Sequence, residues 1–208
     1  EYACRAGTQT TWSFGDDEKV LGDNAWYMKN AHKLYESYAH QVGLKKPNPF
    51  GLYDMHGNVF EFCHDYYGED YYKQSPEKDP TGPTSGSSRV LRGGSWIGGT
   101  SETRAAYRFR FGFRYFDRGF RVVRELDDSE QSPPPPVPPT APEIESTTNT
   151  FGMTLNKIPA GTFMMGSPGL GRAEQQHKVT IRKAFYMQTT EVTQGQWKAV
   201  MGTEPWKG

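Results

Sequence analysis

Residues 48–67 read NPFGLYDMHGNVFEFCHDYY and open the stretch that decides the fold of this 208-residue chain. Four shorter blocks follow in order: DPTGP at 79–83, RVLRGGSW at 89–96, RAAYR at 104–108 and GFR at 119–121. The blocks combine turn-forming residues with rings and guanidinium groups, which is typical of short strands and tight loops rather than of long helices. Blocks of this kind in one order indicate a loop-rich domain.

The composition agrees with an irregular globular fold. The chain has 23 glycines, 15 prolines and 14% aromatic residues, so we expect a core built on large rings and few long helices. Lysine plus arginine and aspartate plus glutamate are equal at 24 each, so no overall field attracts nucleic acid or an anionic membrane. No apolar run approaches the roughly 20 residues that cross a bilayer. We therefore expect no nucleic-acid partner and no membrane span in this chain.

Hydrophobic periodicity predicts where short strands lie. Residues 59–65 alternate between aromatic and other side chains, a period of two that favours a strand with its rings inward. Residues 88–92, 118–123 and 179–181 are also predicted as strands, and a helix is predicted from Thr193. The rings expected to be buried by the sheet are Phe60, Phe62, Trp96 and Phe120.

The five blocks resemble the formylglycine-generating enzyme family, also called sulfatase-modifying factor domains, whose fold is a variant of the C-type lectin fold. The string EYACRAG at residues 1–7 is similar to the second half of a helix in that family. The resemblance implies an α+β fold with a small twisted antiparallel sheet, few helices and long irregular loops.

The resemblance also implies an unusual order of parts. Residues 1–125 resemble the C-terminal part of one such domain, and residues 151–208 resemble the N-terminal part of a second. Between them, residues 126–150 contain SPPPPVPPTAP at 132–142, which lacks amide donors and favours extended polyproline geometry, so a linker with few contacts is expected. Residues 151–208 are expected either to fray or to fill the gap in the first part as its missing strands. Because residue 1 falls inside a domain in this interpretation, the localisation stays open.

The catalytic question depends on cysteines. Enzymes of the family use two cysteines shortly after the Gly-Gly-Ser-aromatic block to bind copper(I), which soft thiolates select. The corresponding residues here, 97–104, contain no cysteine, and Cys4 and Cys63 are the two thiols of the chain. Both are expected to be buried apolar thiols. We therefore expect a binding module with no catalytic residue and no copper; a formylglycine-generating oxidase, or a related metal-dependent oxidoreductase, is the alternative.

Structural Ca²⁺ is the predicted cofactor. Family members hold calcium where the Gly-Asn-Val-aromatic-Glu block turns, with the carboxylate and carbonyl oxygens that this hard cation takes. The matching positions here are Asp54, Gly57, Val59 and Glu61. The alternative is that the two carboxylates cap or salt-bridge the turn. A second family calcium matches Asn24 and Ala25, although the loop at 30–43 departs from that of the enzymes.

The segment between Trp96 and Gly119 interleaves rings with Arg108, Arg110, Arg114 and Arg118. In lectin-fold proteins diversified by retroelements, the matching positions are often asparagine-coded, and adenine mutation gives the residue types found here at Ile97, Gly98, Gly99, Phe109, Phe111, Gly112, Phe113, Tyr115, Phe116 and Asp117. Such rings supply rigid contact area at low entropic cost. The alternative is that single rings build the core. A protein or small-molecule ligand is predicted at the 97–118 loop, on Tyr107, Arg108, Phe109, Phe111, Phe113, Tyr115 and Phe116.

Overall fold

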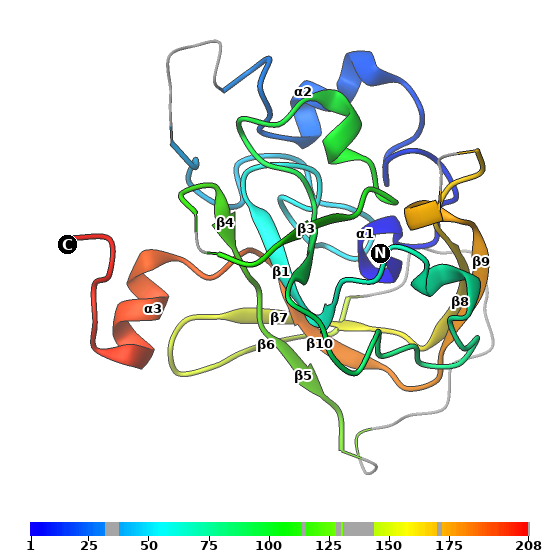
Figure 1. Cartoon of the computed structure of the whole chain (residues 1–208). Coiled ribbons are helices and arrows are strands. Elements are labelled where there is room, and N and C mark those ends of the chain that lie inside the picture. The colour runs from blue at the N-terminus through cyan, green and yellow to red at the C-terminus, as the bar shows by residue number, and fades with distance from the viewer. Residues whose placement is uncertain (32–37, 114, 128–129, 131–143, 170–171, 208) are drawn as a thin grey trace.

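A computed structural model describes residues 1–31, 38–113, 115–127, 130, 144–169 and 172–207 of the chain (Figure 1). Its helices are short. The α-helices are α1 (Tyr2–Arg5), α2 (Leu21–Asn24) and α3 (Gln194–Met201), and the 3₁₀ turns are η1 (Glu18–Val20), η3 (Tyr71–Lys73), η4 (Thr100–Thr103) and η6 (Arg172–Glu174). Loops and short strands make up the rest, which is the α+β, C-type-lectin-like architecture expected from the sequence.

The first sheet brings together the sequence blocks that the resemblance depends on. Its strands are β1 (Phe60–Tyr66), β2 (Arg89–Arg92), β3 (Phe109–Phe111) and β4 (Arg118–Gly119), in the order β3-β2-β1-β4. β2 runs antiparallel to both β1 and β3, whereas β4 runs parallel to β1. The predicted strands at 59–65 and 88–92 are therefore confirmed as β1 and β2.

The second sheet joins the two ends of the chain. Its strands are β5 (Val123–Glu125), β6 (Ser146–Thr148), β7 (Thr154–Ile158) and β10 (Phe185–Gln188), in the order β5-β10-β7-β6. β5 precedes the predicted linker and pairs antiparallel with β10, which follows it. Residues 151–208 therefore contribute strands to a sheet that they share with the first part of the chain.

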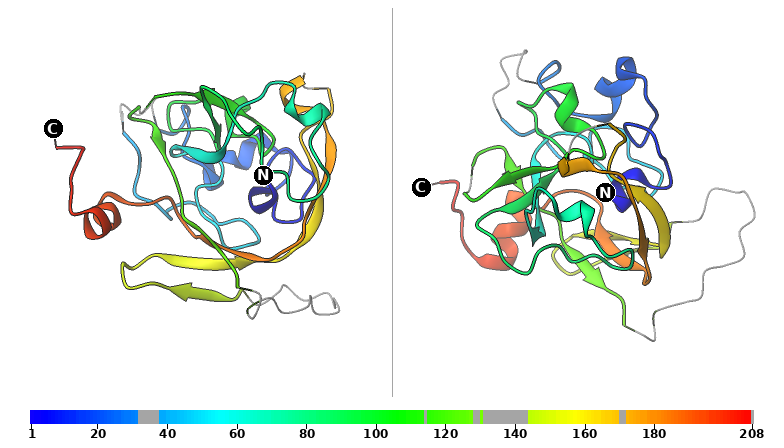
Figure 2. Two further views of the ribbon diagram at one scale, coloured as in Figure 1. Left: turned by 60° about the horizontal axis from the view of Figure 1, so that its bottom comes forward. Right: turned by 45° about the vertical axis from the view of Figure 1, so that its right-hand side comes forward.

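A hairpin of β8 (Gly161–Met165) and β9 (His177–Ile181) completes the fold and curves around the side of the molecule where α1 lies (Figure 2). It confirms the hairpin arm predicted at 179–181. The main-chain carbonyl of Gly166, at the end of β8, accepts a hydrogen bond of 2.9 Å from the Arg5 guanidinium. Arg104 donates two hydrogen bonds, of 2.8 and 3.0 Å, to the Glu174 carboxylate. Arg5 and Arg104 of the first part of the chain thus donate hydrogen bonds to acceptors that follow residue 144.

The ends of the predicted linker differ from the sequence expectation. Leu126 is buried in one apolar cluster with Met153, Leu155 and Tyr186. Strand β6 also falls inside the predicted linker, and its backbone is satisfied by antiparallel pairing with β7. The proline content therefore predicts the middle of the linker but not its two ends. Leu126 and the three residues of β6 find their partners only in the second sheet, which the local sequence does not show. The proline-rich part at 131–143 lies outside the described residues.

The expected burial of rings is confirmed for Phe60 and Trp96. It is wrong for Phe120, which is 37% exposed, and Phe62 is only partly buried. The reason is that the predicted strand at 118–123 is two strands, β4 and β5, in different sheets. Phe120 lies where the chain crosses between them, and its ring meets Trp197 of α3 at 6.1 Å.

The helix predicted from Thr193 is confirmed as α3. The Thr193 hydroxyl accepts from the Gln196 amide, and the Gln196 side chain accepts from the Thr193 amide, which is a capping box. Among the described residues, no helix has the length and apolar character needed to cross a bilayer.

Candidate functional site

A face of aromatic side chains gathers six of the seven residues predicted to contact a ligand. The rings of Tyr107, Phe109 and Phe111 follow one another at 6.4 Å between centroids, with interplanar angles of 14° and 23°. They share one side of the chain because alternate residues of a strand point the same way. Phe113 continues the row at 6.1 Å from Phe111. Phe109 also stacks on the buried Phe60, with 5.7 Å between the ring centroids. These four rings therefore form one row along β3 and the residues that flank it.

Exposure increases along this row of rings. Tyr107, Phe109 and Phe111 are half-buried, whereas Phe113 is 77% exposed. Tyr115 and Phe116 are 54% and 59% exposed and lie 4.2 Å apart. Tyr107, Phe109 and Phe111 are thus partly in the core, in line with the alternative that single rings build it. Phe113, Tyr115 and Phe116 instead face solvent. We call these six residues, together with Arg118, the aromatic face.

Arg118 joins the two groups of rings in this face. Its guanidinium carbon lies 3.9 Å from the centroid of Phe111 and 5.0 Å from that of Tyr115. The side chain is 8% exposed, and its nearest carboxylate oxygen belongs to Asp117 at 3.4 Å. Its Nε and Nη1 atoms are buried without a hydrogen-bond acceptor. The sequence showed Arg118 interleaved with rings, but only the tertiary structure places it between two of them.

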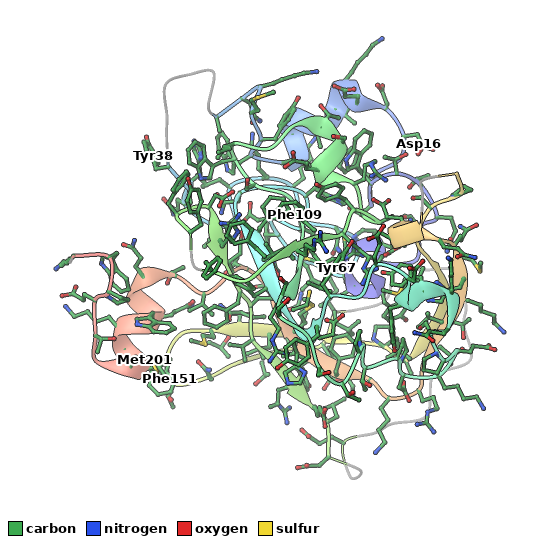
Figure 3. The ribbon with its side chains drawn as sticks, viewed as in Figure 1. Asp16, Tyr38, Tyr67, Phe109, Phe151 and Met201 are labelled. Carbon is green, nitrogen blue, oxygen red and sulfur yellow. The ribbon has the colours of Figure 1, made fainter. Side chains whose placement is uncertain are left out.

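Arg108 is the predicted contact residue that lies elsewhere. It points to the opposite side of β3, is buried, and donates to the Ala173 carbonyl at 2.8 Å. Its guanidinium carbon lies 4.1 Å from the ring of Tyr72 and 5.1 Å from that of Tyr67, which is labelled with Phe109 in Figure 3. Arg108 therefore fastens β3 to the part of the chain around η6 rather than facing a ligand.

The base of the aromatic face is fixed by buried polar contacts. Asp117 is buried and accepts a hydrogen bond of 3.0 Å from the Ser95 hydroxyl. Its main-chain carbonyl accepts from the Phe60 amide at 2.9 Å. Asp117 belongs to the residue types of the diversified loops, but here it anchors the loop to β1.

The first predicted calcium set is only partly available for a cation. Asp54 is 2% exposed; its Oδ2 accepts from the Gly43 amide at 2.7 Å, and its Oδ1 has no hydrogen-bond partner. Glu61 instead forms a buried ion pair, in which Arg121 Nε and Nη2 donate to the two carboxylate oxygens at 2.7 and 2.5 Å. Asp54 therefore fits the expected role, whereas Glu61 is engaged by a guanidinium.

Gly57 and Val59 lie in the tight turn before β1. Gly57 has φ of +140°, and a Cβ atom there would lie 2.2 Å from the Trp26 carbonyl oxygen. The Asn58 amide donates to the same oxygen at 2.8 Å. A side chain at position 57 would break this contact, so the glycine is a requirement of the turn.

The second predicted calcium set is also engaged within the protein. The Ala25 carbonyl accepts from the Asn30 side chain at 2.8 Å, and the Asn24 side-chain amide donates to Val20 at 2.8 Å. Residues 32–37 of the loop that would complete this site lie outside the described residues. Both calcium sets stay predictions. Within the described part of the chain, no group of three or more His, Cys, Asp or Glu side chains is arranged to hold a metal ion.

Glu191 is a buried acidic residue that sequence reasoning missed. It is 2% exposed, its Oε1 accepts from the Asn58 side chain at 3.3 Å, and its Oε2 has no hydrogen-bond partner. Burial and then the Asp54 carboxylate raise the pKa of Glu191 well above its usual range. Burial also raises the pKa of Asp54. In the sequence, Glu191 stands out only as an acidic residue just before a helix start. That position does not indicate its contact with Asn58, which is far away in the sequence.

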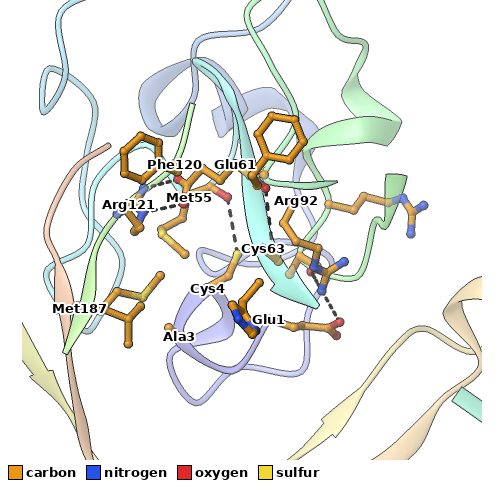
Figure 4. Close-up of a pocket in the computed structure, with 16 residues that line it drawn as sticks. Glu1, Ala3, Cys4, Met55, Glu61, Cys63, Arg92, Phe120, Arg121 and Met187 are labelled. Atoms are coloured by element: carbon orange, nitrogen blue, oxygen red, sulfur yellow. Dashed lines mark hydrogen bonds and ion pairs between the residues drawn. The ribbon is translucent and has the colours of Figure 1, made fainter. Parts of the chain in front are cut away.

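The two cysteines line one cavity of about 490 Å³ where α1, β1 and β10 meet (Figure 4). Both are free thiols; Cys4 is buried as expected, whereas Cys63 is partly buried. Cys4 Sγ lies 3.8 Å from His56 Nε2, and His56 Nδ1 lies 2.8 Å from the Thr103 carbonyl oxygen. Burial opposes ionisation of the Cys4 thiol, but His56 brings its pKa below the ordinary value. Cys4, which lines this cavity, therefore forms a polar pair with the buried His56 behind it.

A family model matches most of this chain, and individual proteins match about half of it. The family model described as "Sulfatase-modifying factor enzyme 1-like domain" matches residues 1–126 and 140–207. A protein named "Serine/threonine-protein kinase pkn1" from Chlamydia pneumoniae is 54% identical over 86 residues, which cover 39% of this chain and 14% of that protein. "Formylglycine-generating enzyme" from Streptomyces coelicolor is 37% identical over 105 residues, covering 47% of this chain and 33% of the enzyme.

A solved structure is similar as well. "Treponema denticola variable protein 1" superposes with a TM-score of 0.52 at 41% identity, covering 57% of this chain and 42% of that chain. The chain thus spans less than half the length of each of these relatives. The five sequence blocks, the fold and the matched ranges agree, and the chain belongs to the family of sulfatase-modifying factor enzyme 1-like domains.

Proposed function

We propose that this chain is a non-catalytic binding module and that the aromatic face contacts a protein partner. The observation that carries the proposal is the position of Arg118, whose Nε and Nη1 lack hydrogen-bond acceptors and whose guanidinium lies between the half-buried Phe111 ring and the exposed Tyr115 ring. Exposed, contiguous apolar surface beside such donors is characteristic of interaction sites. Tyrosine, phenylalanine and arginine supply rigid anchors that carry much of the binding free energy in protein interfaces.

The chemistry of the face favours a partner that presents a carboxylate among apolar side chains. A partner carboxylate placed at the Arg118 guanidinium would supply the hydrogen-bond acceptor that Nε and Nη1 lack, in addition to the ion pair of Nη1 with Asp117 at 3.4 Å. The rings of Phe113, Tyr115 and Phe116 would cover apolar side chains on either side of that carboxylate. The relative from Treponema denticola is named a variable protein. By analogy we propose that the 97–118 loop is the part of this family's scaffold whose side chains vary with the partner.

Display of a random 12-residue peptide library against the immobilised chain tests this proposal. Peptides enriched in aspartate or glutamate next to aromatic or aliphatic residues are expected, and one of them is then measured by calorimetry. Tyr115→Ala and Arg118→Ala are each expected to weaken its binding at least ten-fold, which corresponds to about 1.4 kcal/mol. Phe151→Ala removes a ring that is 45% exposed elsewhere and serves as the matched control. Recovered peptides that bind the two face variants and the wild type equally would reject the proposal.

A second candidate function is the oxidase that the family name implies. One observation favours it: Cys4 and Cys63 line the same cavity, together with Met55 and Met187. We expect no turnover, because neither cysteine lies in the block after Trp96 where the family's enzymes place their thiolates. Incubation with copper(I) and a sulfatase-motif peptide, followed by mass spectrometry for the aldehyde, distinguishes the two. Turnover that is abolished by Cys63→Ser would replace the binding-module proposal.

We also propose that structural Ca²⁺ stiffens the scaffold at the turn before β1. Asp54 supports this, because a buried carboxylate oxygen without a partner is available to a hard cation. Gly57 and Val59 can supply only main-chain carbonyls, and Glu61 is held by Arg121.

A further inference from the structure

Strand β3 lies at one end of the first sheet and has a free side. It pairs with β2 alone, with Phe109 opposite Leu91 and Phe111 opposite Arg89. Among the residues that the structure describes, no main-chain hydrogen bond joins residues 109–111 to any strand other than β2. Alternate residues of a strand at the end of a sheet direct their amide and carbonyl groups outward, where a further strand can bind them.

The side chains of β3 and its flanking residues repeat with the period of a strand. The ring centroids from Tyr107 through Phe109 and Phe111 to Phe113 are 6.4, 6.4 and 6.1 Å apart. Two residues of a strand advance by about 6.6 Å, so an extended chain beside β3 would present every second side chain at nearly the same spacing. Side chains of adjacent strands contact each other when they share a face and a register. The row of rings is therefore matched to an extended partner.

The other ends of the two four-stranded sheets lack this combination. Strand β4 has two residues, and β5 and β6, with the sequences VRE and STT, carry no aromatic ring. Of these four ends, β3 is thus the one where outward main-chain groups and a row of rings occur together.

The central residue of β3 disfavours pairing with a second copy of the chain. Arg110 is exposed, its guanidinium carbon lies 5.5 Å from the Tyr67 ring centroid, and in the described part of the chain it has no carboxylate partner. Two copies of β3 aligned on their central residues would place two Arg110 side chains opposite each other, and like charges in that position are destabilising. An acidic residue of a different chain would instead pair with Arg110.

We infer that the protein partner supplies an extended peptide segment that binds along β3 as an additional strand. The inference rests on the proposed function of the aromatic face and defines how that face is used. Main-chain hydrogen bonds to residues 109–111 hold the segment. Its apolar side chains pack beside Phe109 and Phe111, and an acidic side chain between them, on the opposite side of the sheet, faces Arg110.

Amide hydrogen exchange of the ¹⁵N-labelled chain, measured by NMR, tests the added strand. The probe is a peptide from the display experiment in which an acidic residue stands between two apolar ones, added at a saturating concentration. At least one amide of residues 109–111 is expected to exchange at least ten-fold more slowly in the complex, because it gains a hydrogen-bond acceptor. The amides of β6, at an end of the other sheet, are the matched control and should be unchanged.

The exchange experiment separates this inference from the proposed function. A peptide that needs Tyr115 and Arg118 for binding but leaves exchange at 109–111 unchanged would overturn the added strand and keep the binding face. Slower exchange at 109–111 on raising the protein concentration without peptide, together with a dimer in light scattering, would make a second copy the occupant and would also overturn the inference.

Charge reversal tests the side of β3 that faces away from the rings. Arg110→Glu is expected to weaken binding of the same peptide at least ten-fold, and replacement of its acidic residue by lysine should restore binding to the variant. Lys19→Glu makes the same charge change at an exposed position of η1 and should leave binding unchanged. An unchanged Tm shows that Arg110→Glu remains folded. Equal binding by the wild type and Arg110→Glu would overturn the inferred strand.

Discussion

Arg121 and Glu61 form a buried ion pair in which two guanidinium nitrogens donate to the two carboxylate oxygens, with Nε at 2.7 Å from Oε2. Arg121 also donates to the main-chain carbonyls of Gln188 and Thr189, each at 3.2 Å. The pair therefore connects β1 of the first sheet with the end of β10 in the second. Arg121 thus links the two sheets. It also forms an ion pair with Glu61, the carboxylate that the resemblance assigns to calcium.

Replacement of Arg121 by alanine is expected to lower the free energy of unfolding by about 3–5 kcal/mol, because it leaves Glu61 buried without a cation. Arg121→Lys retains the charge but loses the planar fork, so a smaller but clear loss is expected. Urea denaturation measures both. Arg124→Ala, which breaks a solvent-exposed pair with Glu130, serves as the control and should leave the midpoint nearly unchanged. Equal effects at positions 121 and 124 would contradict the structural role of the pair.

Truncation of a buried ring and of an exposed ring should differ strongly in its effect on the free energy of unfolding. Phe60 is buried under Phe109, so Phe60→Ala is expected to cost about 3–5 kcal/mol of stability. Phe113 is 77% exposed, and Phe113→Ala should change stability by less than about 0.5 kcal/mol. Thermal and urea unfolding of both variants check this. A large loss for Phe113→Ala would mean that the outer ring belongs to the core.

Cleavage within residues 131–143 should leave the two parts of the chain associated. A protease site inserted there allows the cut to be made after folding. The Arg104–Glu174 ion pair and the β5–β10 pairing cross the junction, so the fragments should co-elute in size-exclusion chromatography. The same sample in concentrated urea should separate into two fragments, which verifies complete cleavage. Separation in buffer at micromolar concentration would show that the covalent connection is required.

Stability at alkaline pH should depend on Cys63. Burial and then the Asp65 carboxylate raise the pKa of this thiol to about 12. An unfolded cysteine has a pKa of about 8.5, so the stability contributed by the protonated thiol is complete below that pH and declines as the pH rises toward the folded value. Between about pH 9 and 11, the free energy of unfolding should therefore fall more steeply for the wild type than for Cys63→Ala. The expected difference in slope is about 1.4 kcal/mol per pH unit.

Cys4→Ala is the control for this pH dependence. The pKa of Cys4 is lowered in the folded state, so from about one pH unit above 8.5 its thiol is ionised in both the folded and the unfolded chain and adds little slope. Urea denaturation at several pH values gives both slopes. An unchanged slope in Cys63→Ala would contradict the raised pKa of that thiol.

The sequence by itself determined the elements whose signals lie between neighbouring residues. The alternation around Phe60 and Phe62 predicts β1, because a strand points successive side chains to opposite faces. Thr193 as a capping candidate, followed by Trp197, Val200 and Met201 at helical spacing, predicts the start of α3, because both signals lie within a few neighbouring residues. The five ordered blocks also identified the family and the aromatic face, since the rings of that face follow one another along β3 and the loop after it.

Only the tertiary structure decided which charges meet and where the parts of the chain join. Arg121 selects Glu61, and Glu191 approaches Asp54, through packing of segments far apart in sequence, and no local pattern records such distances. Phe120 became exposed and Leu126 buried because the chain changes sheets between β4 and β5. Local geometry is fixed by covalent neighbours and dihedral preferences, whereas burial and ion pairing depend on which surfaces the assembled sheets remove from water.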